Sequence, residues 1–145
     1  MDFKQDVPWK DQPDITENVF VYSKAFVSRF KSSERTLDYS EASLLKEISY
    51  EIDNYDNWDL VEDDARVYWA QVLAYFSATL CTLFDGVCIG EFNKSNPGSS
   101  YYTFRIKFDK KMLNPEDVIG RACDKQFNLS EWYFDIKSKL NNKNN

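Results

Sequence analysis

The chain has 145 residues, of which 43% are hydrophobic and 29% are charged, and its formal net charge is −6. This length and composition predict one globular core and exclude a largely disordered protein. Because the chain has no histidine, it lacks the usual general base near neutral pH, and histidine-dependent triads and most zinc sites are excluded. Its four glycines are too dispersed to form a phosphate-binding loop.

The cysteines and the two ends of the chain indicate a cytoplasmic protein. Cys81, Cys88 and Cys123 are an odd number at no metal-ligand spacing, and we interpret them as small buried thiols. Residues 1–13 are polar and lack the basic start and apolar stretch of a secretory signal. We expect a single domain over residues 1–145, in which residues 1–13 and 141–145 are flexible.

Apolar residues at helical spacing predict two helices in the N-terminal part of the chain. The first is capped by Asp14 and ends near Ser32, and its apolar stripe consists of Val19, Tyr22, Phe26 and Phe30. The second starts at Asp38 or Ser40 and is amphipathic. We assign four residues to its solvated side: Glu41, Lys46, Glu47 and Glu51.

The uncharged stretch from Val67 to Phe84 is long enough to raise the question of a membrane helix. Polar residues dilute this stretch, however, and no basic cluster at either end supplies an orientation signal. We therefore predict no membrane association. The stretch is interpreted as part of a central helix that begins near Leu60, is buried on most of its faces and stops at Gly86 in a left-handed conformation.

β-Branched and aromatic residues replace the helical pattern after Gly86 and predict two strands, at residues 87–92 and 101–108. Alternation in the second strand places its aromatic residues on a buried face and Arg105 and Lys107 on a solvent face. An antiparallel β-hairpin needs helices on one face to be stable, and the chain supplies them.

Two further helices are predicted after the strands, with starts at Asn114 and Ser130. Asn114 is a capping residue followed by proline at the first helical position, which is a favourable helix start. The expected fold is therefore α+β: a single domain with about five helices packed around a central buried helix, and a small antiparallel β-hairpin or sheet.

The most informative feature is an acidic tract between Lys46 and Arg66, which contains eight carboxylates and no basic residue. Without these eight, the 24 acidic residues of the chain fall to 16, against 18 basic residues, so the tract holds the whole charge imbalance. Such a tract suits docking onto a basic partner, whose association it can speed by roughly 10 to 10³-fold. Its members are Glu47, Glu51, Asp53, Asp56, Asp59, Glu62, Asp63 and Asp64, interleaved with Tyr50, Tyr55 and Trp58.

A purely structural interpretation of the acidic tract competes with this one. Glu62, Asp63 and Asp64 suit the positive end of a helix dipole, Glu47 and Glu51 suit a solvated helix face, and the remaining aspartates suit turns. The absence of any basic residue across the tract favours an interface, because unrelieved like charge costs stability. The spacing does not fit an EF-hand calcium loop, and we expect no bound metal.

In size, acidity, aromatic content and lack of catalytic motifs, the chain resembles the immunity proteins of bacterial toxin systems, including contact-dependent inhibition systems. The resemblance implies a non-catalytic inhibitor without a cofactor, which occludes the active site of a basic toxin domain, often a nuclease acting on DNA or tRNA. Its carboxylates take the place of substrate phosphates. In this chain the expected contacts are Asp53, Asp56, Asp59, Glu62 and Asp63, with Tyr55 and Trp58 as anchors.

Other functions are compatible with the same features. A phage or mobile-element inhibitor of a host nuclease uses the same mechanism on another target, and a carboxylate-based metal-dependent hydrolase uses the tract as ligands. An assembly subunit is a fourth alternative. Arg105 and Lys107 could contact nucleic acid, but the net charge opposes such binding. We expect a basic protein partner, no direct nucleic-acid contact, and a monomer or homodimer.

Overall fold

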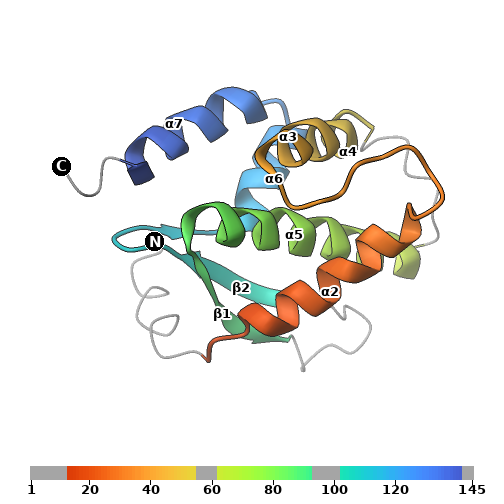
Figure 1. Ribbon diagram of the computed structural model, residues 1–145, viewed down its shortest axis with the longest axis horizontal. Helices are drawn as coiled ribbons and strands as arrows, with labels where there is room; N and C mark the ends of the chain where they lie inside the picture. The colour runs from red at the N-terminus through yellow and green to blue at the C-terminus, as the bar shows by residue number, and fades with distance from the viewer. Residues whose placement is uncertain (1–12, 55–61, 93–101, 142–145) are drawn as a thin grey trace.

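The computed structural model describes residues 13–54, 62–92 and 102–141 and confirms the α+β fold (Figure 1). The helical segments in these ranges are α2 (Thr16–Arg29), the continuous run of α3 (Glu41–Ser43), the π-helix η1 (Leu44–Ile48) and α4 (Ser49–Asp53), then α5 (Glu62–Phe84), α6 (Pro115–Cys123) and α7 (Leu129–Asn141). The strands are β1 (Val87–Phe92), β2 (Tyr102–Lys107) and β3 (Met112–Leu113).

Helix α5 is the centre of the domain, as predicted. It crosses the middle of the molecule in Figure 1, with α2 and the sheet on one side and α3, α4 and α7 on the other. Every residue from Ala70 to Cys81 is buried. Ala65–Phe84 is the one described stretch with the length and apolarity of a membrane span, and 72% of its most apolar window is buried inside the fold. That burial is typical of the core helix of a soluble protein.

Helix α2 packs along α5 through its apolar stripe. Val19 and Phe26 are fully buried, and the Phe26 ring lies 5.5 Å from the ring of Tyr75 and 5.9 Å from that of Tyr68. The helix ends at Arg29, three residues before the predicted end. Tight turns replace the helical hydrogen bonds there, because the Ser33 amide donates to the Phe30 carbonyl at 3.0 Å and the Ser33 hydroxyl donates to the same oxygen at 2.7 Å.

The sheet has the strand order β1-β2-β3 and is antiparallel throughout. The predicted alternation along β2 is confirmed, since Phe104 and Ile106 are buried and Lys107 is exposed. The short strand β3 pairs Leu113 with Ile106 and was not predicted, because two residues show no period. The sheet lies against the part of α5 that leads into β1.

One prediction at a turn is corrected, and one contact is found at a chain end. The Pro13 carbonyl accepts a hydrogen bond from the Gly90 amide of β1 at 3.0 Å, which joins the start of the described chain to the sheet. The left-handed residue after α5 is Asp85, with φ 56°, and not Gly86. Glycine is required at position 86 for close approach instead, since a Cβ there would lie 2.6 Å from the ring of Phe108.

The remaining chain-end predictions fall partly outside the described ranges. Residues 1–12 and 142–145 lie outside them, and Asn141 is the last residue of α7.

Of the three cysteines, Cys81 and Cys88 are buried as predicted, with their sulfur atoms 3.6 Å apart, whereas Cys123 is half-buried.

Helix capping follows the sequence at two starts and differs from the prediction at a third. The side chain of Ser40 accepts from the Ser43 amide at 3.1 Å, and that of Asn114 accepts from the Asp117 amide at 3.2 Å, as predicted. The last helix is capped by Asn128 and not at Ser130, because the Asn128 Oδ1 atom accepts from the Glu131 amide at 3.1 Å. This cap places Asn128 beside the candidate site.

Candidate functional site

The structure describes only part of the predicted contact set. Asp53 is the last residue of α4 and its side chain is exposed. Glu62 and Asp63 are the first residues of α5, and their side chains lie outside the description. Four further predicted contacts lie wholly outside the described residues: Tyr55, Asp56, Trp58 and Asp59.

Glu47 and Glu51 do not form the solvated face that was one interpretation of the tract. Both side chains are only 3% exposed, and both pair with Arg35, a residue outside the tract in sequence. The Arg35 Nε atom lies 2.5 Å from Glu47 Oε1, and its Nη1 atom lies 2.9 Å from Glu51 Oε2. The assignment of these two residues to a solvated helix face is therefore wrong, and their role is structural. Of the other six tract carboxylates, the structure describes the side chain of Asp53, which is exposed.

The burial of Glu47 and Glu51 has a local cause. Leu44, Glu47, Ile48 and Glu51 recur at the spacing that places residues on one face of a helix. Leu44 and Ile48 are fully buried, so Glu47 between them and Glu51 three residues after Ile48 turn inward as well. A buried carboxylate is unstable without a partner, and the Arg35 guanidinium provides one.

The Arg35 guanidinium is held by rings as well as by carboxylates. Its central carbon lies 4.0 Å from the centre of the Phe30 ring and 4.8 Å from that of Tyr50. Burial alone would lower the pKa of Arg35, but the hydrogen bonds with Glu47 and Glu51 outweigh it and raise that pKa above its usual value. Burial, followed by a hydrogen bond to Glu51, likewise raises the pKa of Tyr68. The network is structural, because it pairs two buried carboxylates with a cation.

The outer side of α4 forms a ridge, which we define by Ser49, Tyr50 and Asp53. Tyr50 is 53% exposed, which makes it one of the large hydrophobic side chains on the described surface. Ser49 and Asp53 each line two recesses, one on either side of the ridge. Exposed tyrosine side chains are enriched at protein-binding surfaces relative to the rest of the surface.

The first recess, of about 510 Å³, lies toward Arg35. It is lined by Glu34, Arg35, Lys46, Glu47, Ser49, Tyr50 and Asp53. The Nη2 atom of Arg35 is buried and has no hydrogen-bond partner among the described residues. The charged groups of this recess are mixed in sign, so it does not favour an anion or a cation strongly.

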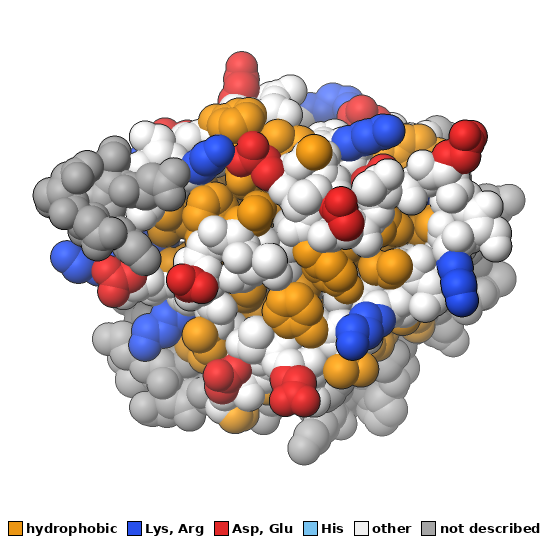
Figure 2. Space-filling view, in the orientation of Figure 1, with side chains coloured by type: hydrophobic (Ala, Val, Ile, Leu, Met, Phe, Trp, Pro, Cys, Tyr) orange, Lys and Arg blue, Asp and Glu red, His pale blue; other side chains and the backbone are white. Residues whose placement is uncertain are grey.

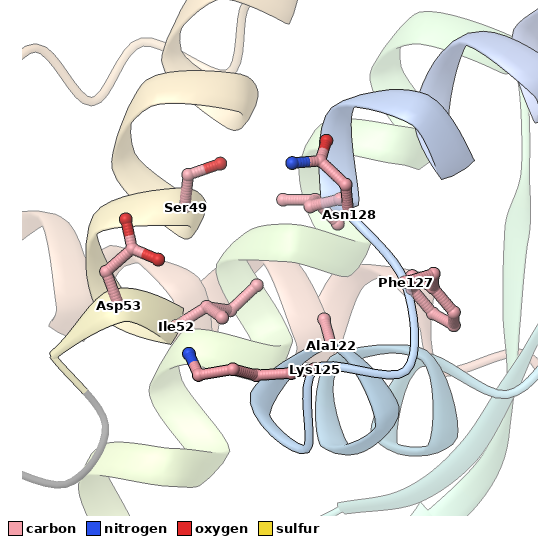
Figure 3. A pocket seen from close by; sticks show the side chains of 8 residues that line it. Ser49, Ile52, Asp53, Ala122, Lys125, Phe127 and Asn128 are labelled. Carbon is pink, nitrogen blue, oxygen red and sulfur yellow. The ribbon is translucent and has the colours of Figure 1, made fainter.

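The second recess, of about 410 Å³, lies between α4 and the connection from α6 to α7 (Figure 3). Ser49, Ile52 and Asp53 come from α4, and Lys125 and Asn128 come from the facing connection. Glu41 fixes the separation of the two walls, because its Oε2 atom accepts from the Tyr133 hydroxyl at 2.6 Å and from Lys137 Nζ at 2.8 Å. These bonds tie the start of the α3–α4 helix to α7.

The backbone conformation at the end of α6 determines the position of Lys125. It has φ 61°, the left-handed conformation that ends α6, and the Gln126 amide donates to the Arg121 carbonyl at 3.0 Å across it. The helix therefore ends at Cys123 and the chain turns back toward α4. This turn brings Lys125 and Asp53 to the same recess, although 72 positions separate them in sequence.

In the residues that the structure describes, no group of three aspartate, glutamate or cysteine side chains is placed to hold a metal ion. On the face shown in Figure 2, acidic and basic side chains alternate around exposed hydrophobic ones. The ridge and its recesses offer hydrogen-bonding groups, a carboxylate and an aromatic ring.

Sequence reasoning missed Arg35, Lys125 and Asn128 as members of this region. The spacing of Glu47 and Glu51 with Leu44 and Ile48 was a usable signal for a buried pair, and hence for a basic partner elsewhere in the chain. No local signal identifies Lys125, because its position depends on the packing of α6 against α4.

Comparison of the chain with known protein families, with curated proteins and with solved structures finds no match.

Proposed function

We propose that the protein is a non-catalytic inhibitor that covers the basic active-site surface of a toxin domain, as immunity proteins of bacterial toxin systems do. The α4 ridge and the acidic segment that follows it form the contact surface. In this proposal the protein acts in the cytoplasm as a monomer or homodimer, without a cofactor and without direct contact to nucleic acid or membrane.

The observation that carries the proposal is that Arg35 pairs with two of the eight carboxylates of the acidic tract and leaves the other six without this partner. The ion pairs remove Glu47 and Glu51 from the surface, whereas Asp53 is exposed and begins the run of six remaining carboxylates. Tyr50, on the same ridge, has an exposed aromatic side chain, and its ring contacts the Arg35 guanidinium. Rigid aromatic anchors beside carboxylates favour a basic protein surface as the partner.

The nature of the partner follows from the charge of the six carboxylates. A nuclease active site carries basic side chains arranged for phosphates, and a row of carboxylates satisfies the same side chains. Asp53, Asp56, Asp59, Glu62 and Asp63 are the proposed contacts, with Tyr55 and Trp58 as additional anchors. A nuclease toxin is therefore the proposed target class.

Affinity capture tests this function. The tagged full chain is used as bait in extracts of its native cells at low salt, and proteins recovered at stoichiometric yield are identified by mass spectrometry. We expect a basic nuclease that elutes as the salt concentration rises, because the contact between exposed charges is screened by salt. Purified bait added back at equal concentration should abolish cleavage of DNA or tRNA by the captured protein.

A charge-reversal variant provides the control for this capture. Asp53→Lys with Asp56→Lys and Asp59→Lys should lose the partner, whereas Glu17→Lys with Asp109→Lys and Asp135→Lys changes the net charge equally outside the tract and should keep it. Recovery of the bait alone, or capture that both variants retain, would overturn the proposed function. A captured nuclease of host-defence type would retain the mechanism and change the target class.

A further inference from the structure

The second recess presents opposite charges on its two facing walls. Figure 3 shows Asp53 on α4 and the Lys125 side chain reaching from the facing connection toward α4, so that its ammonium group lies below Ile52 on the side of Asp53. Among the described residues, neither the Asp53 carboxylate nor the Lys125 ammonium group takes part in a hydrogen bond or an ion pair. The recess therefore keeps two opposite charges apart instead of pairing them.

Uncharged groups complete the recess. Ser49 adds a hydroxyl group next to Asp53, and Asn128 adds its amide on the facing side. Since the Asn128 oxygen already accepts from the Glu131 amide, its NH₂ group is the part left to donate. The floor is apolar, with Ile52, Ala122 and Leu129 among its lining residues.

We propose that this recess binds a small zwitterion of the amino-acid class. The ligand's ammonium group contacts Asp53, its carboxylate contacts the Lys125 ammonium group, and its apolar side chain covers Ile52 and Ala122. A volume of about 410 Å³ accommodates a ligand of this size. A ligand with a single charge leaves one charged wall unpaired, so the recess discriminates against it.

This site does not depend on the proposed inhibitor function, although both use Asp53. A direct titration of the isolated full chain tests it without any protein partner. The ¹⁵N-labelled protein is titrated with L-leucine, with leucinamide, which has only the positive charge, and with N-acetyl-leucine, which has only the negative one. We expect saturable chemical-shift changes at Ser49, Asp53, Lys125 and Asn128 with L-leucine, and binding at least about tenfold weaker with either analogue.

Variants assign each charge of the ligand to its wall. Asp53→Asn should bind L-leucine only as tightly as the wild-type protein binds N-acetyl-leucine. Lys125→Gln should bind L-leucine only as tightly as the wild-type protein binds leucinamide. Asp109→Asn and Lys110→Gln, in the exposed turn between β2 and β3, are matched controls that should leave binding unchanged. Equal affinity for L-leucine and either analogue, or no shift with any of the three probes, would overturn the proposal.

Discussion

Arg35 and Glu47 form an ion pair, with Arg35 Nε 2.5 Å from Glu47 Oε1, that joins the segment after α2 to the inner face of the α3–α4 helix. The carboxylate is 3% exposed and the guanidinium 16% exposed, so water screens the pair little. Together with the pair between Arg35 and Glu51, it neutralises two buried carboxylates of the acidic tract, and the stability of the fold should therefore respond strongly to its removal.

Replacement of Arg35 by Met should lower the free energy of unfolding by about 3–5 kcal/mol, because it leaves Glu47 and Glu51 buried without their cation. Urea denaturation followed by circular dichroism measures the loss. The variant Arg35→Met with Glu47→Leu and Glu51→Met removes all three charges and should recover most of it. A loss below about 1 kcal/mol in Arg35→Met would contradict the buried network.

Glu41 should make the stability depend on pH. Hydrogen bonds from Lys137 and then from Tyr133 lower the pKa of Glu41, so its contribution is present above the pKa of the unfolded state and is lost as the pH falls through the folded value. Because the side chains of Glu41 and Lys137 are each about one third exposed, we expect their ion pair to contribute less than about 1 kcal/mol to the free energy of unfolding. Thermal unfolding of the wild type and Glu41→Gln should differ at neutral pH and converge below about pH 4. A difference that persists in acid would refute this assignment.

Truncation of a buried side chain of α5 should lower the free energy of unfolding far more than truncation of an exposed side chain of α2. Leu80 is fully buried, whereas Val21 is 61% exposed. Leu80→Ala should therefore lower the free energy of unfolding by about 2–5 kcal/mol, with Val21→Ala changing it by less than about 0.5 kcal/mol. Similar denaturation midpoints for the two variants would show that α5 is not the core helix.

The Tyr75 hydroxyl should stabilise the turn at Tyr39. It accepts a hydrogen bond from the Tyr39 amide at 2.9 Å and shares another with the Ser43 hydroxyl at 2.6 Å. Tyr75→Phe leaves the Tyr39 amide without this acceptor and should lower the free energy of unfolding by about 1–3 kcal/mol. Tyr50→Phe, on the exposed ridge, is the matched control and should be nearly neutral. Equal stability of both variants, measured by urea denaturation, would exclude this role.

The three cysteines should differ in reactivity. The contact with Cys81, together with burial, raises the pKa of the Cys88 thiol, and Cys81 is only 6% exposed. Because the thiolate is the reactive form, a disulfide reagent such as dithionitrobenzoate should modify Cys123 first. One thiol should react in the native protein and two more only after denaturation. Rapid reaction of all three in the native state would contradict the burial of this pair.

The fold class could be predicted from local patterns. The unbroken apolar stretch of α5, the alternation in β2 and the capping residues Ser40 and Asn114 each act over a few neighbouring positions, so the sequence displays them directly. The length of α2 was overestimated, because tight turns replace the helical hydrogen bonds after Arg29. The end of α6 depends on a left-handed residue, Lys125, that is not a glycine.

The candidate site could be predicted only in part. Asp53 lies on an exposed ridge, as the interface hypothesis requires, whereas the other predicted contacts, Tyr55, Asp56, Trp58, Asp59, Glu62 and Asp63, lie wholly or in their side chains outside the described residues. Glu47 and Glu51 were assigned to solvent because charge alone was considered. Their spacing with Leu44 and Ile48 places them inside.

The sequence by itself determined the α+β class, the central helix and the concentration of acidic residues in one tract, because these properties follow from composition and from periods of a few residues. Only the tertiary structure decided that Arg35 neutralises part of the tract and that Lys125 faces Asp53 across a recess. Both relationships join segments that are distant in the chain. Such contacts arise from the packing of helices against one another, which no local pattern records.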